Sequence, residues 1–139
     1  GDTTTLEKRV QVALICVLVA GLMPYLWTTV SKVAGPRYDT ADVRGWQARL
    51  TGLPQRAFAA HVNSFEAFPL FAAAVLASFL TGADPQRVMQ LSIAFVLLRL
   101  AYGLVYLMNV AWLRSLVWFG ALGCSVTIFT SALSALSAA

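Results

Sequence analysis

Polar side chains recur at helical spacing inside otherwise apolar stretches of the sequence. Arg99, Tyr102 and Tyr106 are three and four residues apart, so a helix of about 3.6 residues per turn would place them on one face, which Asn109 extends. Their neighbours are mostly leucine, valine, alanine and methionine. Because polar groups are costly among apolar neighbours, this face is expected to contact protein or a polar cavity.

A second polar face precedes the first in the sequence. Arg56, Asn63 and Glu66 are seven and three residues apart, and so share one face of a helix. His61 lies well around that helix from Arg56 and would meet a different neighbour. Glu66 and Arg99 fall at similar depth in their helices, which predicts an ion pair. Such a pair would either hold the helices in register or be shared with a ligand.

Four long apolar runs must position these side chains, and each is about as long as the roughly 20 residues that cross a bilayer as a helix. The runs cover residues 10–30, 57–80, 88–108 and 113–136. Charged residues make up only 12% of the 139-residue chain, against about 25% in soluble domains. The sequence therefore predicts an all-α integral membrane protein.

The expected architecture is a single domain, residues 1–139, folded as an antiparallel four-helix bundle. The expected helices are residues 8–34, 54–81, 85–109 and 112–137, and the polar segment 31–55 is expected to be a loop that leads into the second helix. The first run is longer than the roughly 7–15 residues of a signal-peptide core, so we expect it to be a transmembrane helix. Cys16 and Cys124 both lie inside apolar runs and are expected to be buried thiols.

Basic residues are distributed unevenly between the two expected membrane sides. One side carries Lys32, Arg37, Arg44, Arg49, Arg56 and Arg114, and the other carries Lys8, Arg9 and Arg87. The positive-inside rule then places the first and third connections in the cytoplasm and both termini on the opposite side. Because the basic residues flank apolar runs and form no stripe with interleaved aromatics, no nucleic-acid partner is expected.

Some of the polar residues have simple structural explanations when taken singly. Arg114, at the start of the last run, would snorkel to the membrane boundary, and Trp118 would be an interfacial anchor. His61 has no second histidine or cysteine at metal-binding spacing, so no metal site is expected. Taken together, the set supplies guanidinium, carboxylate, amide and phenol groups. These suit a small zwitterionic ligand, because arginine binds carboxylates with a planar fork.

The stretch from Arg56 to Pro69 resembles the second-helix signature of the MAPEG family, the membrane-associated proteins in eicosanoid and glutathione metabolism. Its recognisable core is the arginine, the His-x-Asn-x-x-Glu sequence from His61 to Glu66, and the proline. The sequence Arg99-x-x-Tyr102-x-x-x-Tyr106, followed by Arg114-Ser115, is similar to the third helix of the family and the start of its fourth. The resemblance extends over essentially the whole chain in length and in the number and order of spans.

This resemblance implies a homotrimer of four-helix protomers that binds glutathione between neighbours near the cytoplasmic side. Glutathione would be the cofactor, and a lipophilic electrophile or hydroperoxide would be the second substrate. Membrane lipid would surround the protein. The glutathione-binding residues carried over by the resemblance are Arg56, His61, Asn63, Glu66, Arg99, Tyr102 and Tyr106. Arg114 and Ser115 would be catalytic, with Arg114 beside the sulfur. A nearby guanidinium favours the thiolate, because it lowers a thiol pKa that is about 8.5 when free.

Departures from the family pattern narrow the implied activity. Ala59 and Val62 stand where the eicosanoid enzymes have arginines, and Trp118 stands where some members carry a tyrosine. The resemblance therefore favours a divergent glutathione transferase or peroxidase, of a bacterial inner-membrane type, over an eicosanoid synthase. Two alternatives stay open: a non-catalytic bundle of the same fold that binds lipid or acts as a scaffold, and a small transporter with Glu66 as its coupling acid.

Overall fold

The computed structural model describes residues 2–138, which form helices and connections and contain no strand. The helices are α1 (Asp2–Ala34), α2 (Val43–Ala48), α3 (Gly52–Thr81), α4 (Pro85–Met108) and α5 (Ala111–Ala138). The predicted all-α class is therefore confirmed, and the four long helices are consistent with the predicted four-helix bundle.

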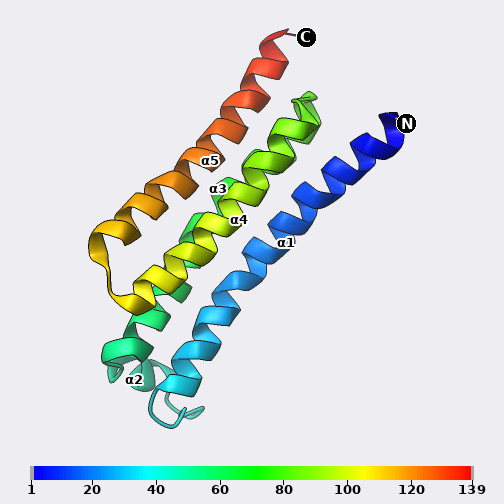
Figure 1. Ribbon diagram of the computed structural model, residues 1–139. Helices are drawn as coiled ribbons and strands as arrows, with labels where there is room; N and C mark the ends of the chain where they lie inside the picture. Colours follow the sequence, from blue (N-terminus) through cyan, green and yellow to red (C-terminus); the bar gives the residue numbers. More distant parts are fainter. Residues whose placement is uncertain (1, 139) are drawn as a thin grey trace.

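The four long helices run side by side, with both termini and the α3–α4 turn at one end (Figure 1). The α2 segment and the α4–α5 junction lie at the other end, so the first and third connections share one side of the bundle. Helix α1 packs against α3 and α4, and α5 packs against the same two helices. Around the bundle the order is therefore α1, α3, α5, α4, and α3 and α4 also touch across the middle.

Local sequence signals fix the two ends of α4. Asp84 precedes the helix and accepts a hydrogen bond from the Gln86 backbone N–H at 3.1 Å, while Pro85 occupies the first turn, where no N–H is needed. Asn109 ends the helix with a left-handed φ of 61°, and asparagine tolerates this conformation better than most side chains. Helix α5 begins two residues later, at Ala111, so α4 and α5 form a tight antiparallel pair.

The segment expected to be only a loop contains the short helix α2. Asp42 accepts a hydrogen bond from the Gly45 N–H at 3.0 Å and so caps its first turn. Trp46 is buried, donates its indole N–H to the Pro36 carbonyl at 3.0 Å, and meets the Tyr38 ring edge to face. The burial of one tryptophan thus ties this connection to the end of the bundle.

Small and aromatic side chains fill the interior of the bundle. Ala13, Ala20 and Ala74 are fully or almost fully buried, and Phe71 of α3 stacks on Phe95 of α4 with ring centroids 3.9 Å apart. Small residues let helices approach closely where lipid, not water, surrounds them. Cys16 and Cys124 are buried free thiols, as predicted.

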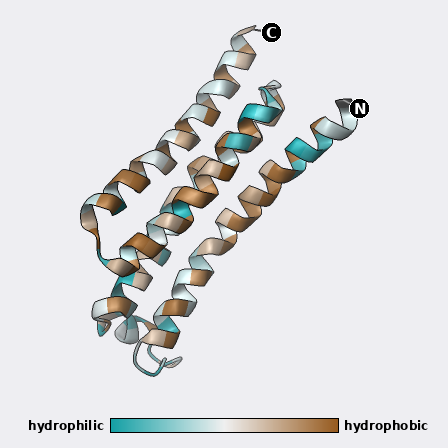
Figure 2. Cartoon of the chain, viewed as in Figure 1, coloured by the Kyte–Doolittle hydropathy of each residue, from teal (hydrophilic) through white to brown (hydrophobic). Residues whose placement is uncertain are grey.

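The outer surface of the bundle is also apolar. Long leucine side chains on α1, such as Leu18 and Leu22, are more than half exposed, and hydrophobic colouring covers much of all four long helices (Figure 2). All four helices are long and apolar enough to cross a membrane. The four apolar helices are therefore consistent with an integral membrane protein.

Candidate functional site

An open groove lies near the α2 end of the bundle, where α3 and α4 meet. Four predicted site residues line it: Asn63 and Glu66 from α3, and Tyr102 and Tyr106 from α4. Its volume is about 430 Å³, within the roughly 300–1,000 Å³ of small-molecule sites. We call it the polar groove. The helical spacing of both pairs explains why their side chains emerge together.

Two tyrosine rings in contact, each with an arginine over its face, border the polar groove. The Arg114 guanidinium lies over the Tyr106 ring, with its central carbon 4.3 Å from the ring centroid. Tyr106 meets Tyr102 edge to face with centroids 5.6 Å apart, and Arg99 lies over Tyr102 at 4.3 Å. Ring faces attract guanidinium groups, so the tyrosines hold both cations in place. This contact holds Arg114, which lies in the first turn of α5, against Tyr106 of α4.

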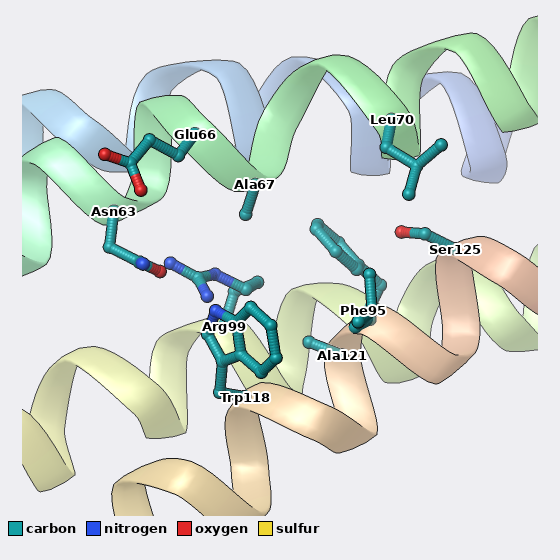
Figure 3. Close-up of a pocket in the computed structure, with 10 residues that line it drawn as sticks. Asn63, Glu66, Ala67, Leu70, Phe95, Arg99, Trp118, Ala121 and Ser125 are labelled. Carbon is teal, nitrogen blue, oxygen red and sulfur yellow. The ribbon is translucent and has the colours of Figure 1, made fainter.

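A second, smaller space adjoins the polar groove among α3, α4 and α5 (Figure 3). Its volume is about 120 Å³, and it shares Asn63 and Glu66 with the groove. We call it the inner cavity. It is lined by Asn63, Glu66, Ala67, Leu70, Phe95, Arg99, Trp118, Ala121, Leu122 and Ser125.

Polar atoms with no partner surround the inner cavity. Arg99 is only 3% exposed and Ser125 only 1%. The Arg99 Nη2, the Ser125 hydroxyl and the Asn63 carbonyl oxygen are all buried without a hydrogen bond. Buried polar atoms are normally hydrogen-bonded, so these three atoms are exceptions to that rule among the residues that line one cavity.

The predicted ion pair between Glu66 and Arg99 is wrong. Within residues 3–138 no carboxylate oxygen lies within 4.0 Å of the Arg99 nitrogens. In Figure 3 the Asn63 amide points toward the guanidinium, and the Glu66 carboxylate lies further off. The face of Tyr102, 4.3 Å away, holds the guanidinium instead. The two charged side chains thus line one cavity without forming an ion pair.

Arg56 and His61 are engaged with backbone carbonyls of neighbouring helices. Arg56 donates from Nε and Nη2 to the Leu107 carbonyl in the last turn of α4, both at 3.2 Å. The His61 Nδ1 lies 2.9 Å from the Pro24 carbonyl in α1. Since a carbonyl only accepts, this bond requires the proton on Nδ1. Neither residue lines the polar groove or the inner cavity.

Ser115, a predicted catalytic residue, and Trp118, a predicted interfacial anchor, both lie on α5. Ser115 is an exposed neighbour of Arg114 on α5. Trp118, expected to be an interfacial anchor, is half-buried and lines the inner cavity together with Ser125. The spacing of Arg114, Trp118, Ala121 and Ser125, at four, three and four residues, is the sequence signal for this face of α5.

The donor set suits an organic ligand better than a metal ion. Over residues 3–138 no three histidine, cysteine, aspartate or glutamate side chains gather to hold a metal. The polar groove instead offers one carboxylate, three side-chain amides (Gln47, Gln55 and Asn63) and two phenols, with a guanidinium at its border. These groups pair with the ammonium, carboxylate and amide groups of a peptide-sized zwitterion.

Comparison with known proteins gives one match. The model of the MAPEG family matches residues 12–134, which includes every residue of the polar groove and the inner cavity. No curated protein and no solved structure matches the chain significantly.

Proposed function

The chain belongs to the MAPEG family, and from that membership we propose that it is a membrane-embedded, glutathione-dependent enzyme of the transferase or peroxidase type. Bound glutathione would supply a thiolate that attacks a lipophilic electrophile or hydroperoxide. The protein would hold the tripeptide in the polar groove, stabilise the sulfur anion, and bring both reactants to one place at the edge of the bilayer.

The polar groove supports this proposal because its free groups match the tripeptide. The Glu66 carboxylate is exposed and would receive the ammonium group of glutathione, while the unpartnered Asn63 carbonyl oxygen would accept a further hydrogen bond. Tyr102 and Tyr106 would form the opposite wall. Arg56 and His61 would act indirectly, by holding the helices that carry these residues.

Arg114 is the proposed thiolate-stabilising residue. Its guanidinium is held over Tyr106 at 4.3 Å, and Tyr106 itself lines the groove. A cation at this border stabilises a thiolate over a thiol, and Ser115 beside it would add a hydroxyl donor. The fixed position of Arg114 against a groove wall is the observation that carries the proposal.

The test is the thiolate absorbance that appears when glutathione is added to the purified protein in detergent. We expect the wild type to show it and Arg114→Ala to lose it. Arg87→Ala is the matched control, because Arg87 is exposed near the start of α4, at the other end of the bundle. Unchanged absorbance with Arg114→Ala would rule out the proposed role of this arginine.

The proposal extends to assembly and location. We expect a homotrimer in a bacterial inner membrane, with α2 and the α4–α5 junction in the cytoplasm and both termini on the other side. The exposed Glu66 supports the assembly, because a carboxylate in a membrane span requires a protein neighbour or a polar ligand.

A non-catalytic bundle of the same fold is the second candidate. It is favoured by one observation, namely that Arg56 and His61 are engaged with Leu107 and Pro24 carbonyls and so serve helix packing. This candidate predicts neither thiolate absorbance nor turnover of any electrophile at millimolar glutathione, from protein whose assembly is intact.

A further inference from the structure

A separate groove lies at the end of the bundle that carries both termini. The α3–α4 turn, the start of α4 and the C-terminal part of α5 form it (Figure 1). Its volume is about 430 Å³, and it shares no residue with the polar groove or the inner cavity. We call it the distal groove. It is lined by Gly82, Ala83, Asp84, Arg87, Thr130, Ser131, Ser134 and Ala135.

Two opposite charges stand unpaired in the distal groove. Asp84 and Arg87 are both exposed, and within residues 3–138 neither lies within ion-pair distance of an opposite charge. Asp84 accepts the Gln86 backbone N–H on Oδ1 at 3.1 Å, which leaves Oδ2 for another donor. The groove therefore presents one cation and one anion side by side, as a complement to a zwitterion.

The hydroxyl groups of α5 divide into acceptors and a donor. Thr130 and Ser131 both donate to the Thr127 carbonyl, at 3.0 and 2.9 Å. A hydroxyl has one hydrogen, so these two oxygens are left as acceptors only. The Ser134 hydroxyl has no partner among residues 3–138 and can donate. A primary ammonium has three donors and no acceptor, and so matches the first two oxygens.

The distal groove lies where lipid headgroups meet the protein. Helix α5 has 28 residues and is therefore about 42 Å long, against about 30 Å for a hydrocarbon core. Its end thus extends into the headgroup layer, and Ser134 lies about one turn from that end. Leu80 and Leu133, near the groove in sequence, are more than half exposed and offer apolar surface to acyl chains. This placement favours a lipid over a ligand from bulk water.

We propose that the distal groove binds the headgroup of a phospholipid with a primary ammonium, namely phosphatidylethanolamine. The Arg87 guanidinium and the Ser134 hydroxyl donate to the phosphate, and the Asp84 carboxylate and the oxygens of Thr130 and Ser131 accept from the ammonium. A choline headgroup has no N–H to donate, and a glycerol headgroup has no cation. Both should therefore bind more weakly. This binding is independent of glutathione.

The test uses the purified full-length protein in mixed micelles that contain equal amounts of dioleoyl phosphatidylethanolamine, phosphatidylcholine and phosphatidylglycerol. Native mass spectrometry counts the lipids retained per protomer. We expect phosphatidylethanolamine to bind at least tenfold more tightly than the other two, and Arg87→Ala to weaken it at least tenfold. Lys8→Ala removes an exposed cation of α1 at the same end of the bundle and is expected to have no effect.

Asp84→Asn tests the ammonium end without disturbing the start of α4, because asparagine caps a helix as well as aspartate does. We expect the preference for phosphatidylethanolamine over phosphatidylcholine to fall below about threefold. Glu7→Gln, a matched loss of an exposed carboxylate on α1, should keep the full preference.

Three results would overturn the proposal. They are equal retention of the ethanolamine and choline lipids by the wild type, tighter retention of phosphatidylglycerol, and equal effects of Lys8→Ala and Arg87→Ala. The first two need no variant, so they decide even if a variant fails to fold. Arg114→Ala is expected to retain the lipid and Arg87→Ala to retain the thiolate absorbance, so this proposal and the glutathione proposal fail separately.

Discussion

The three arginines near the polar groove make different contacts. Arg56 donates two hydrogen bonds to one backbone carbonyl in the last turn of α4. Arg99 is buried over the Tyr102 ring with one nitrogen unpartnered, and Arg114 is held over Tyr106 at the groove border. A stacked guanidinium keeps its hydrogen-bond donors at the ring edge available. Stacking therefore fixes Arg99 and Arg114 in place without using up their binding capacity.

Glu66 provides the sharpest test of ligand binding at a single residue. We expect Glu66→Gln to weaken glutathione binding at least tenfold, because a charge-assisted hydrogen bond is worth about 1.5–3 kcal/mol and tenfold corresponds to about 1.4 kcal/mol. Stability should change little, since the side chain is exposed and has no ion-pair partner in the described chain. Equilibrium dialysis with labelled glutathione measures the affinity. Glu7→Gln, near the start of α1 and far from the groove, is the control, and an equal effect of both changes would contradict the assigned role.

How much of the site could be predicted from the sequence depends on where each partner lies. Asn63, Glu66, Tyr102 and Tyr106 line one groove because helical spacing alone determines which face they share. Arg56 and His61 could not be assigned in this way, since their partners are backbone carbonyls of Leu107 and Pro24, which every residue type possesses.

Arg56 connects α3 to the last turn of α4. We expect Arg56→Gln to lower the free energy of unfolding by about 1–3 kcal/mol, because two hydrogen bonds from a charged donor to the end of α4 are lost. Glutathione affinity of the folded protein should stay within about threefold, or about 0.6 kcal/mol. Denaturant unfolding in detergent measures the first quantity. Arg49→Gln, an exposed change at the end of α2, should be neutral. A large loss of affinity without a loss of stability would instead make Arg56 a ligand-binding residue.

The contact between α1 and α4 depends on the absence of a side chain at Gly103. A Cβ atom there would overlap the buried Trp27 indole, whereas a Cβ at Gly123 of α5 would meet nothing within 4 Å. We therefore expect Gly103→Ala to destabilise the bundle by about 1–3 kcal/mol. Gly123→Ala should be neutral or stabilising by up to about 1 kcal/mol, because alanine is the better helix former. Thermal unfolding followed by circular dichroism compares the two. Equal effects would mean that Trp27 moves aside without cost.

The long helices were easier to predict from the sequence than the short one. Each long helix is marked by an apolar run of membrane-spanning length, and Asp84 and Pro85 lie at the start of α4. Helix α2 has six residues, too few to show a period, and it is held by burial of Trp46 and a bond to Pro36. Such a contact can be predicted only when the end of α1 is known to lie beside α2.

The arrangement of the four long helices determines which residues lie at the same end of the bundle. The polar groove includes Gln47 of α2 and therefore opens at the α2 end, opposite both termini (Figure 1). Glutathione is the thiol buffer of the cytosol. An enzyme that draws on it requires the α2 end to face the cytoplasm, which agrees with the basic residues of the first connection.

Single-cysteine labelling tests this orientation. In a background with Cys16→Ala and Cys124→Ala, which removes two buried thiols, Thr4→Cys and Thr40→Cys place one exposed thiol at each end of the bundle. We expect a membrane-impermeant maleimide to label Thr4→Cys in intact spheroplasts and Thr40→Cys only after the membrane is permeabilised. The reverse pattern would place the polar groove on the side away from cytosolic glutathione. The glutathione-dependent function would then lose its thiol supply.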